Sequence, residues 1–173
     1  MQPTIKQVVI LGSGVMGSRI ACHFAGIGVQ VLLLDRLQPG AEESKHSKER
    51  NKLVNDALQA SIKSNPSPIY SSAFTKNIRT GNFTDDMPQI ANADWIIEVV
   101  LEDIKIKHAT YEKIQKHRKK GSIVSSNTST ITLAKLVDGQ ADDFVKDFMI
   151  THFFNPVRYV SLLEIITGDT TNK

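Results

Sequence analysis

Several classes of protein are excluded by what this sequence has little of. Its single cysteine, Cys22, rules out an intrachain disulfide and a cysteine-rich metal site. No apolar run approaches the roughly 18 residues that a membrane-spanning helix needs. The net charge of only +3 at pH 7 falls far short of the dense positive surface that nucleic-acid binding requires. We therefore expect a protein with no metal, no nucleic-acid partner and no membrane span.

The two ends of the chain give further expectations. Met1–Lys6 lacks the basic-then-apolar layout of a secretory signal peptide, so we expect a cytoplasmic location. The 173 residues have the length of one domain, and 40% of them are hydrophobic, which suffices to build a core. Asp169–Lys173 is a polar tail directly after a strand-like segment, which leads us to expect that the natural chain is longer.

Strand-like and helix-like segments alternate along the whole chain. Two apolar runs at residues 5–11 and 29–34 flank a helical pattern at 15–27 that ends at Gly28. Further strands are expected at residues 77–83, 95–100, 122–125, 147–151 and 162–166. Further helices are expected at residues 41–64 and 104–118, and in a short segment ending near Gly139. The alternation predicts a doubly wound, mostly parallel α/β sheet, with the 41–64 helix as an arm inserted after the second strand.

The loop after the first strand is rich in glycine. Its sequence, Gly12-Ser13-Gly14-Val15-Met16-Gly17, matches the GxGxxG pattern between a buried strand and a helix. The first glycine allows a tight turn, the second lets the backbone approach a pyrophosphate, and the third allows the helix to pack closely on the strand. Unpaired N–H groups at the start of the helix attract the phosphates. Residues 1–173 are therefore predicted to form a Rossmann-type dinucleotide-binding domain.

An acidic residue stands at the end of the second strand. Asp35 lies about twenty residues after the glycine loop, where a carboxylate accepts hydrogen bonds from the adenosine ribose hydroxyls. The 2′-phosphate of NADP would meet a like charge at this position. Although Arg36 at the same edge can serve NADP, Asp35 in the ribose position favours NAD as the cofactor.

The second half of the chain carries further motifs, which are the segments IEVVLE at 97–102, SNTS at 126–129 and HFFNP at 152–156, with Glu164 downstream. Together with the glycine loop and Asp35, they stand in the order and at the spacing of the 3-hydroxyacyl-CoA dehydrogenases of fatty-acid oxidation. The chain resembles this family over essentially its whole length. Residues 151–164 look most like the bacterial multifunctional members that also carry an enoyl-CoA hydratase part.

The resemblance implies an NAD-dependent oxidation of (S)-3-hydroxyacyl-CoA to 3-ketoacyl-CoA in fatty-acid β-oxidation. It assigns His152 as the general base, Glu164 as its partner, and Ser129 as the residue that hydrogen-bonds the substrate oxygen. It also places four side chains around the nicotinamide ribose end of the cofactor, those of Glu102, Lys107, Ser129 and Asn155. Glu98 is left open between a structural and a functional role.

The chemistry of alcohol oxidation agrees with these assignments. A base must remove the hydroxyl proton, and histidine has a pKa near the working pH. A carboxylate on the other ring nitrogen would fix the tautomer and stabilise the imidazolium. His152 and Glu164 form such a pair if the chain reverses at Asn155-Pro156 and brings residues 162–166 back beside the strand of His152.

The positions of the candidate residues provide an independent check. The five that define the predicted site, Gly12, Asp35, Glu102, Ser129 and His152, all follow the carboxyl ends of expected strands. In open α/β sheets, ligands bind at that edge. We therefore expect residues far apart in the sequence to converge on one rim of the sheet.

Enzymes of the resembled family carry a helical C-terminal domain that closes the active-site cleft and makes much of a dimer interface. Nothing in these residues matches that domain, so we expect this chain to bind NADH and to turn over poorly or not at all. The complete protein is expected to be a homodimer or part of a multifunctional chain, with an acyl-CoA substrate. The 41–64 segment stands where the family has an arm that contacts coenzyme A, and its candidate phosphate partners are Lys45, Lys48, Lys52 and Lys63.

Two other functions remain open at this stage. One is an NAD-dependent dehydrogenase of a small hydroxy acid, although such enzymes usually rely on a catalytic lysine in a different setting. The other is a non-catalytic NAD-binding module, which would have no need of His152, Glu164 and Ser129 together.

Overall fold

The computed structural model describes residues 4–172. Residues 1–3 of the N-terminal segment and Lys173 of the polar tail lie outside the described residues, so the expectations for those positions are not addressed by the fold.

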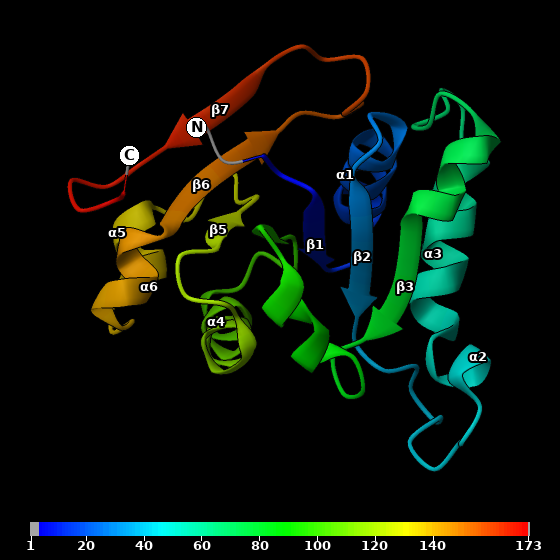
Figure 1. The fold of residues 1–173 in the computed structure, drawn as a ribbon, viewed down its shortest axis with the longest axis horizontal. Helices are drawn as coiled ribbons and strands as arrows, with labels where there is room; N and C mark the ends of the chain where they lie inside the picture. The colour runs from blue at the N-terminus through cyan, green and yellow to red at the C-terminus, as the bar shows by residue number, and fades with distance from the viewer. Residues whose placement is uncertain (1–3, 173) are drawn as a thin grey trace.

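A single seven-stranded sheet runs through the described part of the chain in the order β3-β2-β1-β4-β5-β6-β7 (Figure 1). Its strands are β1 Gln7–Leu11, β2 Gln30–Asp35, β3 Ile78–Asn82, β4 Trp95–Glu98, β5 Ile123–Ser126, β6 Phe148–Phe153 and β7 Leu163–Ile166. The neighbouring strands from β3 to β6 pair in parallel, and β7 pairs antiparallel with β6. The order 3-2-1-4-5-6 is that of the Rossmann fold, so the expected fold class is confirmed.

Helices cover both faces of this sheet. They are α1 Val15–Gly26, α2 Ser47–Arg50, α3 Lys52–Ile62, α4 Ile104–His117, α5 Leu133–Val137 and α6 Asp142–Lys146, with 3-10 helices η1 Ser72–Asn77 and η2 Met87–Asn92. Because side chains alternate along a strand, Val8 and Ile10 of β1 pack in the core under α1 and α3. Val9 and Leu11 pack in the core under α4. Within residues 4–172, none of these helices has the length and apolar character needed to cross a membrane.

The expected helix over residues 41–64 is wrong in its first half, where the chain turns and the helix begins only at Ser47. The side chain of Arg50 explains the difference. Its guanidinium donates to the carbonyl oxygens of Ala41, Glu42 and Ser44 at 2.7–3.3 Å, which a helix would have used as its own acceptors. It also binds the Asp85 carboxylate at 2.7 Å. The first half of the arm therefore wraps around one arginine.

The sequence pattern also missed short elements and one burial. The 3-10 helices η1 and η2 and the single-turn helix α6 fall in segments that have no long hydrophobic period. Directly after α4, Arg118 stands among other basic residues, a setting in which side chains are normally solvated. Its side chain is 2% exposed and donates to Asp147 at 2.6 Å and to Asp143 at 3.3 Å. A buried ion pair between the end of α4 and the carboxylates in and directly after α6 leaves no periodic signal in the sequence.

The core beneath α4 contains a cluster of aromatic rings. Phe148 of β6 packs against Tyr111 of α4 at a centroid distance of 5.3 Å and against Phe144 of α6 at 5.2 Å. All three side chains are fully buried. Phe148 therefore joins the strand that carries His152 to the helices on this face.

Replacing Phe148 with alanine is expected to lower the free energy of unfolding by about 3–5 kcal/mol, because the lost ring leaves a cavity. Urea unfolding measures this change. The control variant Leu101→Ala alters a side chain that is 73% exposed and is expected to change stability by less than about 0.5 kcal/mol. Equal effects of the two substitutions would contradict the packing described for this core.

Candidate active site

The glycine loop connects β1 to α1. It is closely packed against the protein at Gly12 and Gly17 and open to a ligand at Gly14. Gly12 has a φ of +110°, and a Cβ there would lie 2.5 Å from the Val99 carbonyl oxygen. A Cβ on Gly17 would lie 1.8 Å from the carbonyl oxygen of Gly12. Larger residues are therefore excluded at both positions. A Cβ on Gly14, by contrast, would meet nothing within 4 Å, so the backbone at the start of α1 is open to an approaching group.

This loop fits the pyrophosphate of a dinucleotide. The helix α1 begins at Val15, which is 65% exposed, and Gly14 precedes it without a capping side chain. The first N–H groups of a helix have no partner within the helix, and the positive end of the helix dipole adds to their attraction for phosphate. The predicted loop residues thus lie in one place, with donors and open space together.

Asp35 at the end of β2 lies directly beside the glycine loop. Its Oδ2 accepts hydrogen bonds from the Ser13 backbone N–H at 2.5 Å and from the Ser13 hydroxyl at 2.6 Å. Its Oδ1 accepts from the Arg36 backbone N–H at 2.7 Å. Asp35 therefore holds the loop, and as a carboxylate it keeps lone pairs that can accept from ribose hydroxyls.

His152 and Glu164 face each other across two antiparallel strands. The register pairs His152 of β6 with Glu164 of β7, so the two side chains are on the same face of the sheet. Nδ1 of His152 lies 2.8 Å from Oε2 of Glu164, and Nε2 lies 3.0 Å from the Ser129 hydroxyl oxygen. The expected reversal of the chain is present, and it places His152 between a carboxylate and a hydroxyl. In detail His152 lies inside β6, one residue before its end, rather than beyond the strand.

Glu102, in the turn between β4 and α4, binds the loop that carries Ser129. Its Oε1 accepts from the backbone N–H groups of Ser129 and Thr130 at 3.2 Å each and from the Thr130 hydroxyl at 3.1 Å. It also accepts from the Thr128 hydroxyl. Burial alone would raise the pKa of Glu102, but the Thr128 hydroxyl, the Lys107 ammonium and the Thr130 N–H outweigh it and lower the pKa to about 2.

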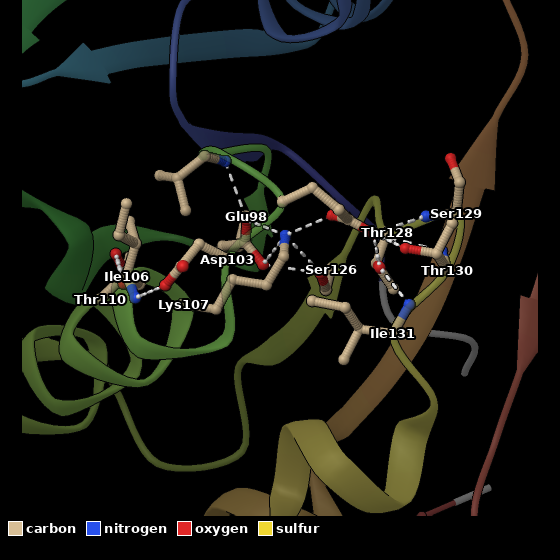
Figure 2. A network of polar contacts seen from close by, with 12 residues as sticks. Glu98, Asp103, Ile106, Lys107, Thr110, Ser126, Thr128, Ser129, Thr130 and Ile131 are labelled. Carbon is tan, nitrogen blue, oxygen red and sulfur yellow. Dashed lines mark hydrogen bonds and ion pairs between the residues drawn. The ribbon is translucent and has the colours of Figure 1, made fainter.

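Lys107 in the second turn of α4 is buried, with its side chain 1% exposed. Its Nζ lies 2.9 Å from Oε1 of Glu98 and 3.2 Å from Oε2 of Glu102, so it bridges two carboxylates. Figure 2 shows this ammonium between Glu98, Ser126 and the loop residues. Lys107 was expected at the nicotinamide ribose end of the cofactor, and in the structure its ammonium is already bound by these two carboxylates.

Asn155 lies in the connection from β6 to β7, and its Oδ1 accepts a hydrogen bond from Arg19 of α1. Of the predicted site residues, Glu102, Lys107, Ser129, His152 and Glu164 form one continuous chain of contacts. The glycine loop and Asp35 form a second group. Both groups lie at the carboxyl ends of the parallel strands, as expected.

Sequence reasoning missed Arg19, Tyr111 and Thr130, which hold this site, and it quoted Ser126 and Thr128 within the segment 126–129 without giving them a role. Glu98 was left open, although it carried a signal. An acid inside the apolar run Trp95–Val100 must either disrupt a buried strand or have a cationic partner. The individual contacts of the hydroxyl residues gave no comparable signal, because serine and threonine are common in loops. Among the described residues, no cluster of His, Cys, Asp and Glu side chains could hold a metal ion.

Comparisons with known proteins agree with this geometry. The family model described as the NAD-binding domain of 3-hydroxyacyl-CoA dehydrogenase matches residues 7–173. A protein of Bacillus subtilis named "Probable 3-hydroxyacyl-CoA dehydrogenase" is 45% identical, over 96% of this chain and 22% of its own length. A "Putative fatty acid oxidation complex trifunctional enzyme" of Rickettsia felis is 41% identical, over 96% of this chain and 22% of its own length.

Solved structures show the same fold. That of (S)-3-hydroxybutyryl-CoA dehydrogenase from Ralstonia eutropha superposes with a TM-score of 0.70 at 27% identity, and the match covers 98% of this chain and 56% of that one. The chain thus spans only about a fifth of the two curated relatives. The family match confirms NAD as the expected cofactor. From the match over residues 7–173, this chain belongs to the family of NAD-binding domains of 3-hydroxyacyl-CoA dehydrogenases.

Proposed function

We propose that the complete protein oxidises (S)-3-hydroxyacyl-CoA to 3-ketoacyl-CoA, and that this chain supplies its cofactor-binding half and its catalytic base. The observation that carries the proposal is the position of His152, with Nδ1 2.8 Å from Glu164 and Nε2 3.0 Å from the Ser129 hydroxyl. A histidine held in this way at the rim of a dinucleotide-binding sheet is equipped for proton transfer.

The three side chains have separate tasks in the proposed reaction. The Glu164 carboxylate accepts the Nδ1–H of His152, which fixes the tautomer and leaves the Nε2 lone pair free to take a proton. The Ser129 hydroxyl lies within hydrogen-bonding distance of that nitrogen. An alcohol oxygen bound by Ser129 is therefore also within reach of Nε2. When His152 becomes positively charged, the carboxylate of Glu164 stabilises it.

The residues of the first half would hold NAD. The backbone of Gly12, Gly14, Val15, Met16 and Gly17 would receive the pyrophosphate, and Asp35 would accept from the adenosine ribose. At the other end, Glu102, Lys107, Ser129 and Asn155 would surround the nicotinamide ribose. When bound, NAD would be the oxidant, because it accepts a hydride, a proton with two electrons, from the carbinol carbon, while the hydroxyl proton goes to His152.

Location and assembly belong to the same proposal. Cys22 is the single cysteine of the sequence, so these residues form no intrachain disulfide. We therefore propose a cytoplasmic location. The Rickettsia felis relative bears the name of a trifunctional enzyme, which supports a multifunctional chain. A homodimer is the alternative assembly, and analytical ultracentrifugation of the complete protein distinguishes the two.

Asp35→Asn is expected to weaken NADH binding about 10- to 100-fold, because a hydrogen bond to a charged acceptor is lost. Isothermal titration calorimetry of this chain with NADH and with NADPH measures the effect, and NADPH binding should suffer less. Asp56→Asn is the control, since Asp56 is 64% exposed and pairs only with Lys52 among the described residues. An absence of heat with the unaltered chain at millimolar NADH would refute NAD binding.

His152→Ala in the complete natural chain is expected to lower the rate of acetoacetyl-CoA reduction by NADH by about 10²–10⁴-fold, because a general acid–base group is lost. The NADH affinity should stay nearly unchanged, since the glycine loop and Asp35 are intact. A variant that keeps its full rate would show that another group moves the proton. If the unaltered complete chain binds NADH but shows no reduction, the chain is a non-catalytic module.

Neutralising the lysines of the arm is expected to weaken acyl-CoA binding. Lys45, Lys48, Lys52 and Lys63 are exposed, and their joint replacement with glutamine should lower the affinity roughly tenfold, at a modest energy for each exposed charge. NADH affinity should not change. The matched control replaces four exposed lysines elsewhere, Lys116, Lys119, Lys120 and Lys146. Equal losses in both variants would mean that only net charge matters, and the arm would have no specific role.

A further inference from the structure

Glu98 at the end of β4 is a charged residue in the interior of the domain. Its side chain is fully buried, yet both of its oxygens are saturated with donors. Oε1 accepts from Lys107 Nζ at 2.9 Å and from the Val100 backbone N–H at 2.8 Å. Oε2 accepts from Lys107 Nζ at 3.1 Å, from the Tyr111 hydroxyl at 3.0 Å and from the Ser126 hydroxyl at 2.6 Å.

Stability alone does not account for this arrangement. Taking two charges out of water is costly, and a buried ion pair replaced by apolar residues of similar size is often no less stable. The Tyr111 hydroxyl also donates to Glu98. Burial and the Glu98 charge raise the pKa of Tyr111, so its hydroxyl keeps its proton and remains a donor. Polar groups from β5 and α4 thus all donate to this one carboxylate at the end of β4.

The contacts lead from Glu98 to the predicted catalytic residues. Lys107 donates to Glu98 on one side, and on the other side its Nζ lies 3.2 Å from Oε2 of Glu102. Glu102 in turn binds the hydroxyl and N–H groups of the loop Thr128–Thr130, and Ser129 in that loop meets His152 at 3.0 Å. Figure 2 shows Glu98 from β4, Lys107 from α4 and the residues Thr128–Thr130 of the loop after β5 close together.

We propose that Glu98 is a positioning residue, which fixes the ammonium of Lys107 and, through Glu102, sets the Ser129 hydroxyl against His152. The inference rests on the proposed function in one respect, that Ser129 and His152 are the reacting pair. A lysine side chain is long and flexible. The Lys107 ammonium therefore stays beside Glu102 only if a second anion, Glu98, also binds it. A neutral residue at position 98 leaves Glu102 and the loop without that support.

Glu98→Gln in this chain tests the proposal. The backbone amides of Ser129 and Thr130, which donate to Glu102, are expected to exchange with deuterium about tenfold faster, as for the loss of one modest interaction. The ¹⁵N signal of His152 Nε2 should also shift, because its contact with Ser129 loosens. The amides of Lys105 and Ile106, which donate to Asp103, serve as an internal reference and should not change.

A second variant separates positioning from stability. Glu98→Gln combined with Lys107→Met removes both charges and should recover the thermal stability that the single change loses. Loop protection and the His152 signal should stay as in the single variant. If they return to the values of the unaltered chain together with stability, Glu98 has a structural role only and the proposal fails.

Milder variants keep the test decisive if both of these fail to fold. Tyr111→Phe removes one donor to Glu98 and keeps both charges, so a smaller acceleration of Ser129 and Thr130 exchange is expected. Thr110→Val, one residue away on α4, removes a hydroxyl that within residues 4–172 bonds only the Ile106 carbonyl and is the matched control. Equal exchange in the two variants would overturn the proposal. None of these measurements uses NADH or acyl-CoA, so an inactive His152 would leave their outcome unaffected.

Discussion

The meeting of the loops of the proposed site depends on the parallel pairing of β1, β2, β4, β5 and β6, and the pairing of His152 with Glu164 adds the antiparallel strand β7. Parallel strands deliver their carboxyl ends to one edge, and the loops that follow them are forced to meet there. The pairing of Leu11 with Glu98, and of Glu98 with Ser126, shows the alignment directly. The glycine loop, the Glu102 turn and the Ser129 loop are neighbours because those strands end in register, although more than a hundred residues separate the glycine loop from Ser129 in sequence.

Much of this arrangement could be predicted from sequence, where a strong local signal existed. The apolar runs around Gly12–Gly17 and Asp35 predict the first strand–loop–helix–strand unit, and the alternation of strands and helices along the chain predicts the mostly parallel sheet. The resemblance pairs Glu164 with His152 on the condition that the chain reverses at Asn155-Pro156, a turn signal between two strand patterns. The arm at 41–64 could not be predicted, because its shape depends on Arg50 binding carbonyl groups and Asp85, a residue in a distant turn.

The polar interior shows a second limit of sequence reasoning. Lys107 follows a helical pattern in which a lysine is normally solvated, and its burial depends on Glu98 nine positions earlier. Hydrophobic periodicity indicates which face of a helix is apolar. It does not indicate which charged side chain on the helix has a buried partner of opposite charge. Glu98 itself was visible as an acid in an apolar strand, and the missing information was the identity of its partners.

The antiparallel turn from β6 to β7 has a consequence for how sequences of this kind can vary. His152 and Glu164 meet because they are directly opposite in the ladder, and side chains on a strand change face with every residue. One inserted residue within β7 would send the carboxylate to the far side of the sheet. The connection between the strands carries no such parity, and it is held instead by single contacts, those of Asn155 with Arg19 and of Arg158 with the Ser67 carbonyl. Related sequences should therefore reject single insertions and deletions inside either strand.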